Sequence, residues 1–218
     1  MTADGTPRFL KDPFSGISHG IGLVFALVGS GWLLGHARDG VSLATLGIYT
    51  ACLVVLYTAS TIYHLMLAGE RLTRALRLFD HVAIFLFVAG TSTPVLVRGL
   101  SGDTRVAMLS VMWGVAFVGI LAKLLWKTAP RALYTLMYVG MGWSVVGTGR
   151  ALMNGLSAAS FALVVAGGVV YTLGAVVYAL KWPNPRPERF GFHEIWHLFV
   201  LGGSALHFAA IALLACGG

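Results

Sequence analysis

Two histidines four residues apart begin the last hydrophobic segment of the chain, within the sequence Gly191-Phe192-His193-Glu194-Ile195-Trp196-His197. On a helix, His193 and His197 share one face and lie about 6 Å apart along the axis, so one helix offers two imidazoles to the same metal ion. Burying ionisable groups in a bilayer is costly, and a pair placed where a membrane helix begins therefore predicts a functional site.

The same residues satisfy the H-E-x-x-H pattern of zinc proteases, in which the glutamate is the general base. The extended form of that pattern places a glycine and a third histidine at positions that are valine and glycine here, and no acidic residue follows His197. An intramembrane protease with Asp80 as third ligand is one alternative. The simpler interpretation places Glu194 at the membrane surface, near Arg186 or Arg189.

The composition is that of a membrane protein. Of 218 residues, 57% are hydrophobic and 11% are charged, whereas soluble domains have about 25% charged residues. Seven apolar stretches are long enough to cross the roughly 30 Å of bilayer hydrocarbon as helices. We therefore expect an all-α integral membrane protein, a single seven-transmembrane helix bundle over residues 1–218 that begins with a short N-terminal segment, 1–15. The predicted spans are Gly16–His36, Leu43–Leu67, Leu76–Val97, Val106–Trp126, Ala132–Arg150, Ser157–Leu180 and Phe192–Cys216.

The distribution of lysine and arginine predicts the orientation of the bundle, because basic residues concentrate in cytoplasmic loops. Eleven of the 15 basic residues fall on the side of the N-terminus, and the other side carries Arg38, Arg98, Arg105 and Arg150. The N-terminus, including segment 1–15, is predicted to be cytoplasmic and the C-terminus to lie outside. The excess positive charge is then explained by contact with anionic lipid head groups, without nucleic acid as a partner.

Orientation places five polar residues from three spans in the same layer of the membrane. Ser60 and His64 lie near the cytoplasmic end of the second span, and they share a helix face. Asp80 lies about one turn inside the same leaflet on the third span. The seventh span begins on that side, which adds His193 and His197.

These residue types in one layer predict a catalytic zinc site. Three neutral imidazoles, from His64, His193 and His197, are a common ligand set for zinc with an open position for water. Asp80 is able to bind that water or the metal and to take and return a proton, while Ser60 donates a hydrogen bond to the developing oxyanion, which equips the site to hydrolyse an amide or an ester. Ser60 has an alternative interpretation as a small packing residue that bonds its own preceding turn.

The same residues carry a resemblance to a known family. The combination of Ser60-Thr61-Ile62-Tyr63-His64, Phe79-Asp80-His81 and His193-Glu194-Ile195-Trp196-His197, in this order on the second, third and seventh spans, resembles the hemolysin III family. That family is the bacterial branch of the progestin and adipoQ receptors, in a superfamily that includes the alkaline ceramidases.

The resemblance implies a seven-helix bundle with Zn²⁺ near the cytoplasmic face, bound by His64, His193 and His197, with Asp80 and Ser60 holding the water of the metal. Relatives in the superfamily hydrolyse ceramide-like amides, whereas the bacterial members are named for a haemolytic, pore-like activity.

The first span departs from the pattern of the family. Its relatives tend to carry a glutamate and an asparagine before a threonine–histidine pair, and the corresponding positions here are Asp12, Ser15, Ser18 and His19. His19 lies at the cytoplasmic level, where it either lines the entrance to the site or meets lipid head groups or a backbone carbonyl.

The other histidines and the glycines have structural interpretations first. His36 and His81 are expected to bond locally. His207 lies about 15 Å deeper than His197, too far to join the metal, and either lines a cavity or bonds a neighbouring helix. The pairs Gly167-Gly168 and Gly202-Gly203 suit close helix approach in lipid.

The sequence thus favours a zinc-dependent hydrolase of a lipid amide or ester, located as a multi-pass protein in the bacterial inner membrane with membrane lipids as partners. Two alternatives stay open: a channel or pore-former that uses the metal as a structural clasp, and a receptor-like sensor of membrane state.

Overall fold

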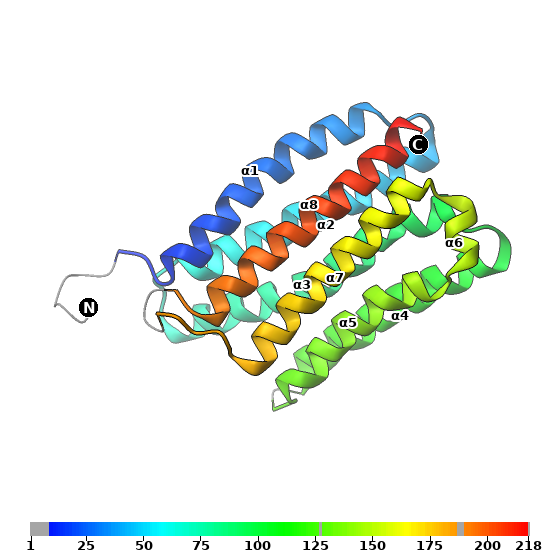
Figure 1. Cartoon of the computed structure of the whole chain (residues 1–218). Helices are drawn as coiled ribbons and strands as arrows, with labels where there is room; N and C mark the ends of the chain where they lie inside the picture. The colour runs from blue at the N-terminus through cyan, green and yellow to red at the C-terminus, as the bar shows by residue number, and fades with distance from the viewer. Residues whose placement is uncertain (1–8, 127, 187–189, 218) are drawn as a thin grey trace.

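The chain is almost entirely helical (Figure 1). The computed structural model describes residues 9–126, 128–186 and 190–217, and over these ranges the chain forms eight α-helices without a β-sheet. The helices are α1 (Pro13–Gly35), α2 (Gly40–Leu65), α3 (Glu70–Gly99), α4 (Gly102–Leu125), α5 (Arg131–Gly147), α6 (Arg150–Gly155), α7 (Ala158–Leu180) and α8 (Phe192–Cys216).

Six of these helices, all except α5 and α6, are long and apolar enough to cross a membrane. Their outward faces carry large apolar side chains, among them Phe25, Phe117 and Leu173, which are exposed. Such faces are unfavourable in water and suit contact with lipid tails. The chain is therefore an all-α, multi-pass membrane protein, as its composition predicts.

Six of the seven predicted spans each coincide with one helix, with ends that differ by a few residues. The largest difference is at α3, which begins at Glu70 rather than Leu76. Hydropathy excludes this charged first turn and a half from the span, but Arg, Leu and Glu are good helix formers and continue the helix beyond the apolar region.

The fifth predicted span, Ala132–Arg150, differs more. Its helix, α5, has 17 residues and ends at Gly147. The chain then passes through Gly149, whose φ of 48° is accessible to glycine at little cost, and continues as the short helix α6. The sequence predicted the helix but not its break at Gly147-Thr148-Gly149.

The arrangement of the helices brings several helix ends together. In Figure 1, α1 and α8 lie side by side, α7 packs against α8, and α4 and α5 form one edge of the bundle. The beginnings of α1, α3 and α8 and the end of α2 lie at the same end of the bundle, opposite the C-terminus of the chain. This end carries the polar residues that the sequence singles out.

Backbone hydrogen bonds fix the segment that precedes α1 to the last turn of α2. The Lys11 amide donates to the Leu65 carbonyl at 3.3 Å, and the Asp12 amide donates to the His64 carbonyl at 2.8 Å. Because the last carbonyls of a helix have no partner within it, these bonds satisfy groups that would otherwise be orphaned. They also place Asp12 next to His64.

Glycine allows α7 and α8 to approach closely, as the paired glycines predict. A Cβ atom at Gly167 would collide with the ring of His207, and one at Gly203 would collide with the ring of Tyr171. Glycine therefore allows aromatic side chains from the opposite helix to lie against the backbone at both positions.

We expect Gly203→Ala to lower the free energy of unfolding by about 1–3 kcal/mol, the usual cost of overpacking. Gly202→Ala is the matched control, because its Cβ would meet only the Val170 side chain at 3.5 Å, an ordinary contact. Thermal unfolding of the two purified variants in the same detergent checks this. Equal stability of the two would contradict the close packing at Gly203.

Candidate metal centre

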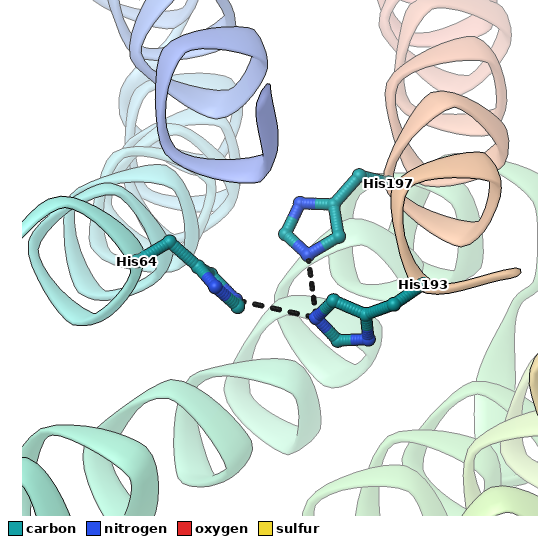
Figure 2. Close-up of side chains that lie close together, drawn as sticks. All are labelled: His64, His193 and His197. Carbon is teal, nitrogen blue, oxygen red and sulfur yellow. Dashed lines mark hydrogen bonds between the residues drawn. The ribbon is translucent and has the colours of Figure 1, made fainter. Parts of the chain in front are cut away.

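Three histidines converge at the end of the bundle where α2 ends and α8 begins (Figure 2). His64 lies in the last turn of α2, and His193 and His197 occupy successive turns at the start of α8. The Nε2 atom of His193 is 3.2 Å from that of His197 and 3.5 Å from that of His64. His64 and His197 are buried, and His193 is partly buried. The structure therefore brings together the three histidines that the sequence groups in one layer.

The spacing of these nitrogens suits a metal ion. Zinc–nitrogen bonds of about 2.0–2.1 Å in tetrahedral geometry place two ligand nitrogens about 3.3 Å apart, and the observed separations of 3.2 Å and 3.5 Å lie on either side of this value. Hydrogen bonds alone satisfy the arrangement poorly, because each neutral imidazole has only one N–H to donate. A cation that accepts all three lone pairs fits the donors present.

Asp12 is not one of the three candidate ligands, but it orients the ring of His64. Its carboxylate accepts a hydrogen bond from Nδ1 of His64 at 3.1 Å, which leaves Nε2 of His64 unprotonated and directed toward the other histidines. Burial raises the pKa of Asp12, but the hydrogen bond from His64 and the charge of Lys11 outweigh it, so the pKa lies below its ordinary value. Asp12 is therefore the charged partner expected of a metal-binding histidine.

No definite role for Asp12 is predicted from the sequence, because the residue precedes the first span and no local pattern connects it with His64. The only indication in the sequence was that Asp12 stands where relatives in the resembled family tend to carry a glutamate. The backbone hydrogen bond from the Asp12 amide to the His64 carbonyl brings the two side chains together. The spacing of residues in the sequence does not predict this hydrogen bond.

Ser60 lies one turn before His64 on α2 and is bonded to the first helix. Its hydroxyl is 2.8 Å from Nδ1 of His19, and both residues are buried. The ring of His19 also lies against that of His197, with centroids 4.0 Å apart. His19 is thus inside the site rather than at the lipid head groups, and Ser60 has a partner on another helix rather than in its own preceding turn.

Asp80 lies on α3. None of its atoms belongs to the group of close ligand atoms that His64, His193 and His197 form. Its Oδ2 is 3.6 Å from Nδ1 of His81. Asp80, Ser60, His193 and His197 all line the same cavity. This location leaves the carboxylate free to face a molecule in that cavity.

Glu194 has a structural task in the described part of the chain. Its Oε2 accepts the Gly191 amide at 2.8 Å at the start of α8, and its Oε1 accepts from the Ser15 hydroxyl at 3.4 Å. A glutamate at this position satisfies an orphan amide of the helix start. No ion pair joins it to Arg186 among the described residues, and Arg189 lies outside them.

The remaining described histidines form local hydrogen bonds, each to a backbone carbonyl one helical turn earlier. Nδ1 of His36, His81 and His207 each lies within 2.9 Å of the backbone carbonyl four residues earlier. His36 and His81 behave as expected. His207 in addition lines the cavity and stacks on Tyr171, with centroids 5.2 Å apart.

The cavity beside the centre has a volume of about 930 Å³. It begins among the polar residues at the histidine end and extends between α3, α5, α7 and α8. Its deeper walls include Phe87, Val95, Val146, Val164 and Val200. A polar site thus opens directly into a largely apolar chamber.

Fold and site together define a class: multi-pass helical membrane proteins with a histidine centre formed by the second and the last helix. A family model described as "Haemolysin-III related" matches residues 8–208. The chain therefore belongs to this family.

Curated relatives agree with this membership. The chain is 33% identical over 209 residues to Hemolysin-3 of Bacillus cereus, covering 94% of this chain and 92% of the relative. It is 33% identical over 202 residues to a Hemolysin-3 homolog of Bacillus subtilis (strain 168), covering 89% and 90%. It is also 28% identical over 200 residues to the human monocyte to macrophage differentiation factor, covering 89% and 80%.

If the three histidines hold a metal ion, Asp12→Asn is expected to weaken its binding by roughly 10- to 100-fold, the usual effect of losing the carboxylate behind a ligand histidine. Competition with a chromophoric chelator measures the affinity. Asp39→Asn is the control, because Asp39 caps α2 at the opposite end of the bundle through Ser42. Unchanged affinity in Asp12→Asn would show that the Asp12–His64 hydrogen bond is not part of the centre.

Proposed function

We propose that this protein is a zinc-dependent hydrolase of the bacterial inner membrane that cleaves an amide or ester bond of a membrane lipid. The observation that carries the proposal is the convergence of three histidine Nε2 atoms beside a cavity that His193 and His197 line together with Asp80 and Ser60. A purely structural clasp between helices would need neither this carboxylate and hydroxyl nor an adjoining chamber.

The donor set favours zinc as the metal. Three imidazole nitrogens suit zinc, while magnesium and calcium prefer oxygen ligands. His64, His193 and His197 would hold the ion. When bound, zinc supplies a Lewis acid and lowers the pKa of a coordinated water toward neutrality.

The residues of the chain would complete the reaction. The Asp80 carboxylate would accept a proton from the attacking water and return it to the leaving nitrogen or oxygen. The Ser60 hydroxyl would donate a hydrogen bond to the oxyanion that develops on the scissile carbonyl. His19, through its 2.8 Å contact with Ser60, would hold that hydroxyl in position.

The cavity supports a lipid as substrate. A volume of about 930 Å³ is at the upper end of the roughly 300–1,000 Å³ range of ligand pockets. Its apolar depth suits a hydrocarbon chain, and its polar end suits a carbonyl group near the metal. Access between helices would let a lipid enter from the membrane.

For the topology we propose seven spans, with α5 as the seventh crossing helix beside the six longer ones. Its 17 residues extend over roughly 25 Å, and the chain continues through α6 before α7. The excess of basic residues at the histidine end would make that end cytoplasmic. The N-terminus would then be inside and the C-terminus outside.

Seven crossings place the C-terminus outside the cytoplasm. An alkaline phosphatase fused there is therefore expected to be active, and a fluorescent protein that folds only in the cytoplasm is expected to give no fluorescence. The same two reporters fused at the N-terminus, or after Lys181 in the loop between α7 and α8, should give the opposite pattern. If both termini report the same side, the number of crossings is even and α5 does not cross.

For the hydrolase, we expect the purified wild type to contain one zinc per chain, and His64→Ala and His197→Ala to lose it. Asp80→Asn is expected to retain zinc and to lose hydrolysis of lipid amides or esters by at least about 100-fold, because a general base contributes 10²–10⁴-fold. Elemental analysis and product analysis by mass spectrometry measure the two properties. His36→Ala is the matched control, since His36 bonds locally at the other end of α1.

The outcomes separate this proposal from its alternatives. Wild-type protein without stoichiometric metal would contradict the site as a whole. Zinc without hydrolysis of any lipid tested, together with ion leakage from vesicles that depends on the histidines, would favour a pore with a structural metal.

A further inference from the structure

Three basic residues from three helices line the same cavity near the candidate metal centre. Arg77 comes from α3, Lys123 from α4 and Arg131 from α5. Within the described residues, none of the three forms an ion pair. Arg74, which also lines the cavity, is paired with Glu70 at 3.2 Å. The mouth of the cavity, defined here by Arg77, Lys123 and Arg131, therefore has an excess of positive charge.

Aromatic rings hold two of these cations in place. Nζ of Lys123 lies 4.1 Å from the ring centroid of Tyr134, and the guanidinium of Arg131 lies 4.9 Å from that of Tyr178. These contacts stabilise the cations over the rings, although long basic side chains at a membrane surface can extend into water. The rings thus keep positive charge at the mouth of the cavity.

The mouth adjoins the metal centre. The Tyr178 ring, on which Arg131 lies, is 5.9 Å from the His193 ring between centroids and 5.5 Å from that of Trp196. The Tyr178 ring thus contacts Arg131 and lies near His193, so an anion bound by Arg131 would lie close to a candidate metal ligand.

No carboxylate forms an ion pair with these three cations among the described residues. Asp80 also lines the cavity, but it is paired with none of Arg77, Lys123 and Arg131. Like charges at one opening disfavour one another, and an oxyanion between them removes this penalty. Guanidinium groups suit phosphate in particular, because they donate two parallel hydrogen bonds.

The general excess of basic residues at this end does not account for the cluster. Arg71 lies on the same helix as Arg77, and Lys181 follows α7, but neither lines the cavity. Attraction to anionic lipid surfaces explains such exposed residues. Arg77 and Arg131 are also exposed, but they differ from Arg71 and Lys181 because each of them lines the cavity, as Lys123 does.

We propose that the mouth formed by Arg77, Lys123 and Arg131 binds the phosphate head group of an amphiphile whose hydrocarbon tail lies in the cavity. This inference deepens the proposed function, on which it rests for the placement of the scissile bond near the histidines. It identifies the substrate class as anionic, phosphate-bearing lipids.

Native mass spectrometry of the full-length protein in neutral detergent tests the inference. The probes are lysophosphatidic acid, lysophosphatidylcholine with the same acyl chain, and inorganic phosphate. We expect the wild type to bind lysophosphatidic acid at least tenfold more tightly than lysophosphatidylcholine. Lys123→Gln/Arg131→Gln should lose this preference, and Arg71→Gln should keep it.

Two further variants guard against misfolding. Lys123→Arg and Arg131→Lys preserve the charge and are expected to retain most of the preference, and thermal unfolding of the glutamine double variant checks that it is folded. Equal affinity for the two lipids in wild type, or an undiminished preference in the folded double variant, overturns the inference. An equal loss in Arg71→Gln also overturns it, because the preference would then come from overall surface charge.

Two further measurements test whether the anion is a lipid head group or free phosphate, and whether the mouth or the metal binds it. If inorganic phosphate alone competes as well as lysophosphatidic acid does, the mouth binds a soluble anion and the amphiphile is wrong. The variant His197→Ala, which lacks one candidate metal ligand, is expected to keep the preference, because the basic residues at the mouth of the cavity are unchanged. If His197→Ala loses the preference, the metal rather than the mouth holds the phosphate. Retained preference with no hydrolysis of any lipid would contradict the proposed function but not this inference.

Discussion

Three imidazole nitrogens directed at one another inside a helix bundle are the constraint on which the rest of the structure depends. These ligand atoms lie within 4.8 Å of one another, and His64 and His197 are buried, so leaving their lone pairs without a partner is costly. To satisfy the geometry, the end of α2 and the start of α8 must lie at the same level although more than a hundred residues separate them. The N-terminal segment must lie there too, because Asp12 orients His64. The close α7–α8 contact at Gly167 and Gly203 then fixes the helix that supplies two of the three histidines.

The features that could be predicted from the sequence are those set by local composition and by helix period. Hydropathy located the helices, and a spacing of four placed His193 beside His197. The arrangement of spans in alternating directions brought His64 and Asp80 to the same level. These inferences need only the length of a helix and the thickness of a bilayer.

The features that sequence did not reveal depend on contacts between helices or on single backbone angles. The hydrogen bond between His19 and Ser60 joins α1 to α2, and nothing in either segment specifies the relative rotation of the two helices. The early end of α5 depends on a positive φ at Gly149, one glycine among 28 in the chain. The clustering of Arg77, Lys123 and Arg131 on one cavity wall likewise requires three helices to be in place. Glu194 illustrates the same limit, because a protease-like motif placed at the first turn of a helix gives its glutamate a capping partner instead of a catalytic one.

The distance along the chain between the three histidines has a consequence for biosynthesis. The ribosome delivers His64 more than a hundred residues before His193 and His197. A growing chain that has inserted only its first helices therefore carries one candidate ligand without its partners, and a single imidazole binds a metal ion weakly. A metal ion that needs all three histidines would be bound only after α8 has been made and has packed into the bundle.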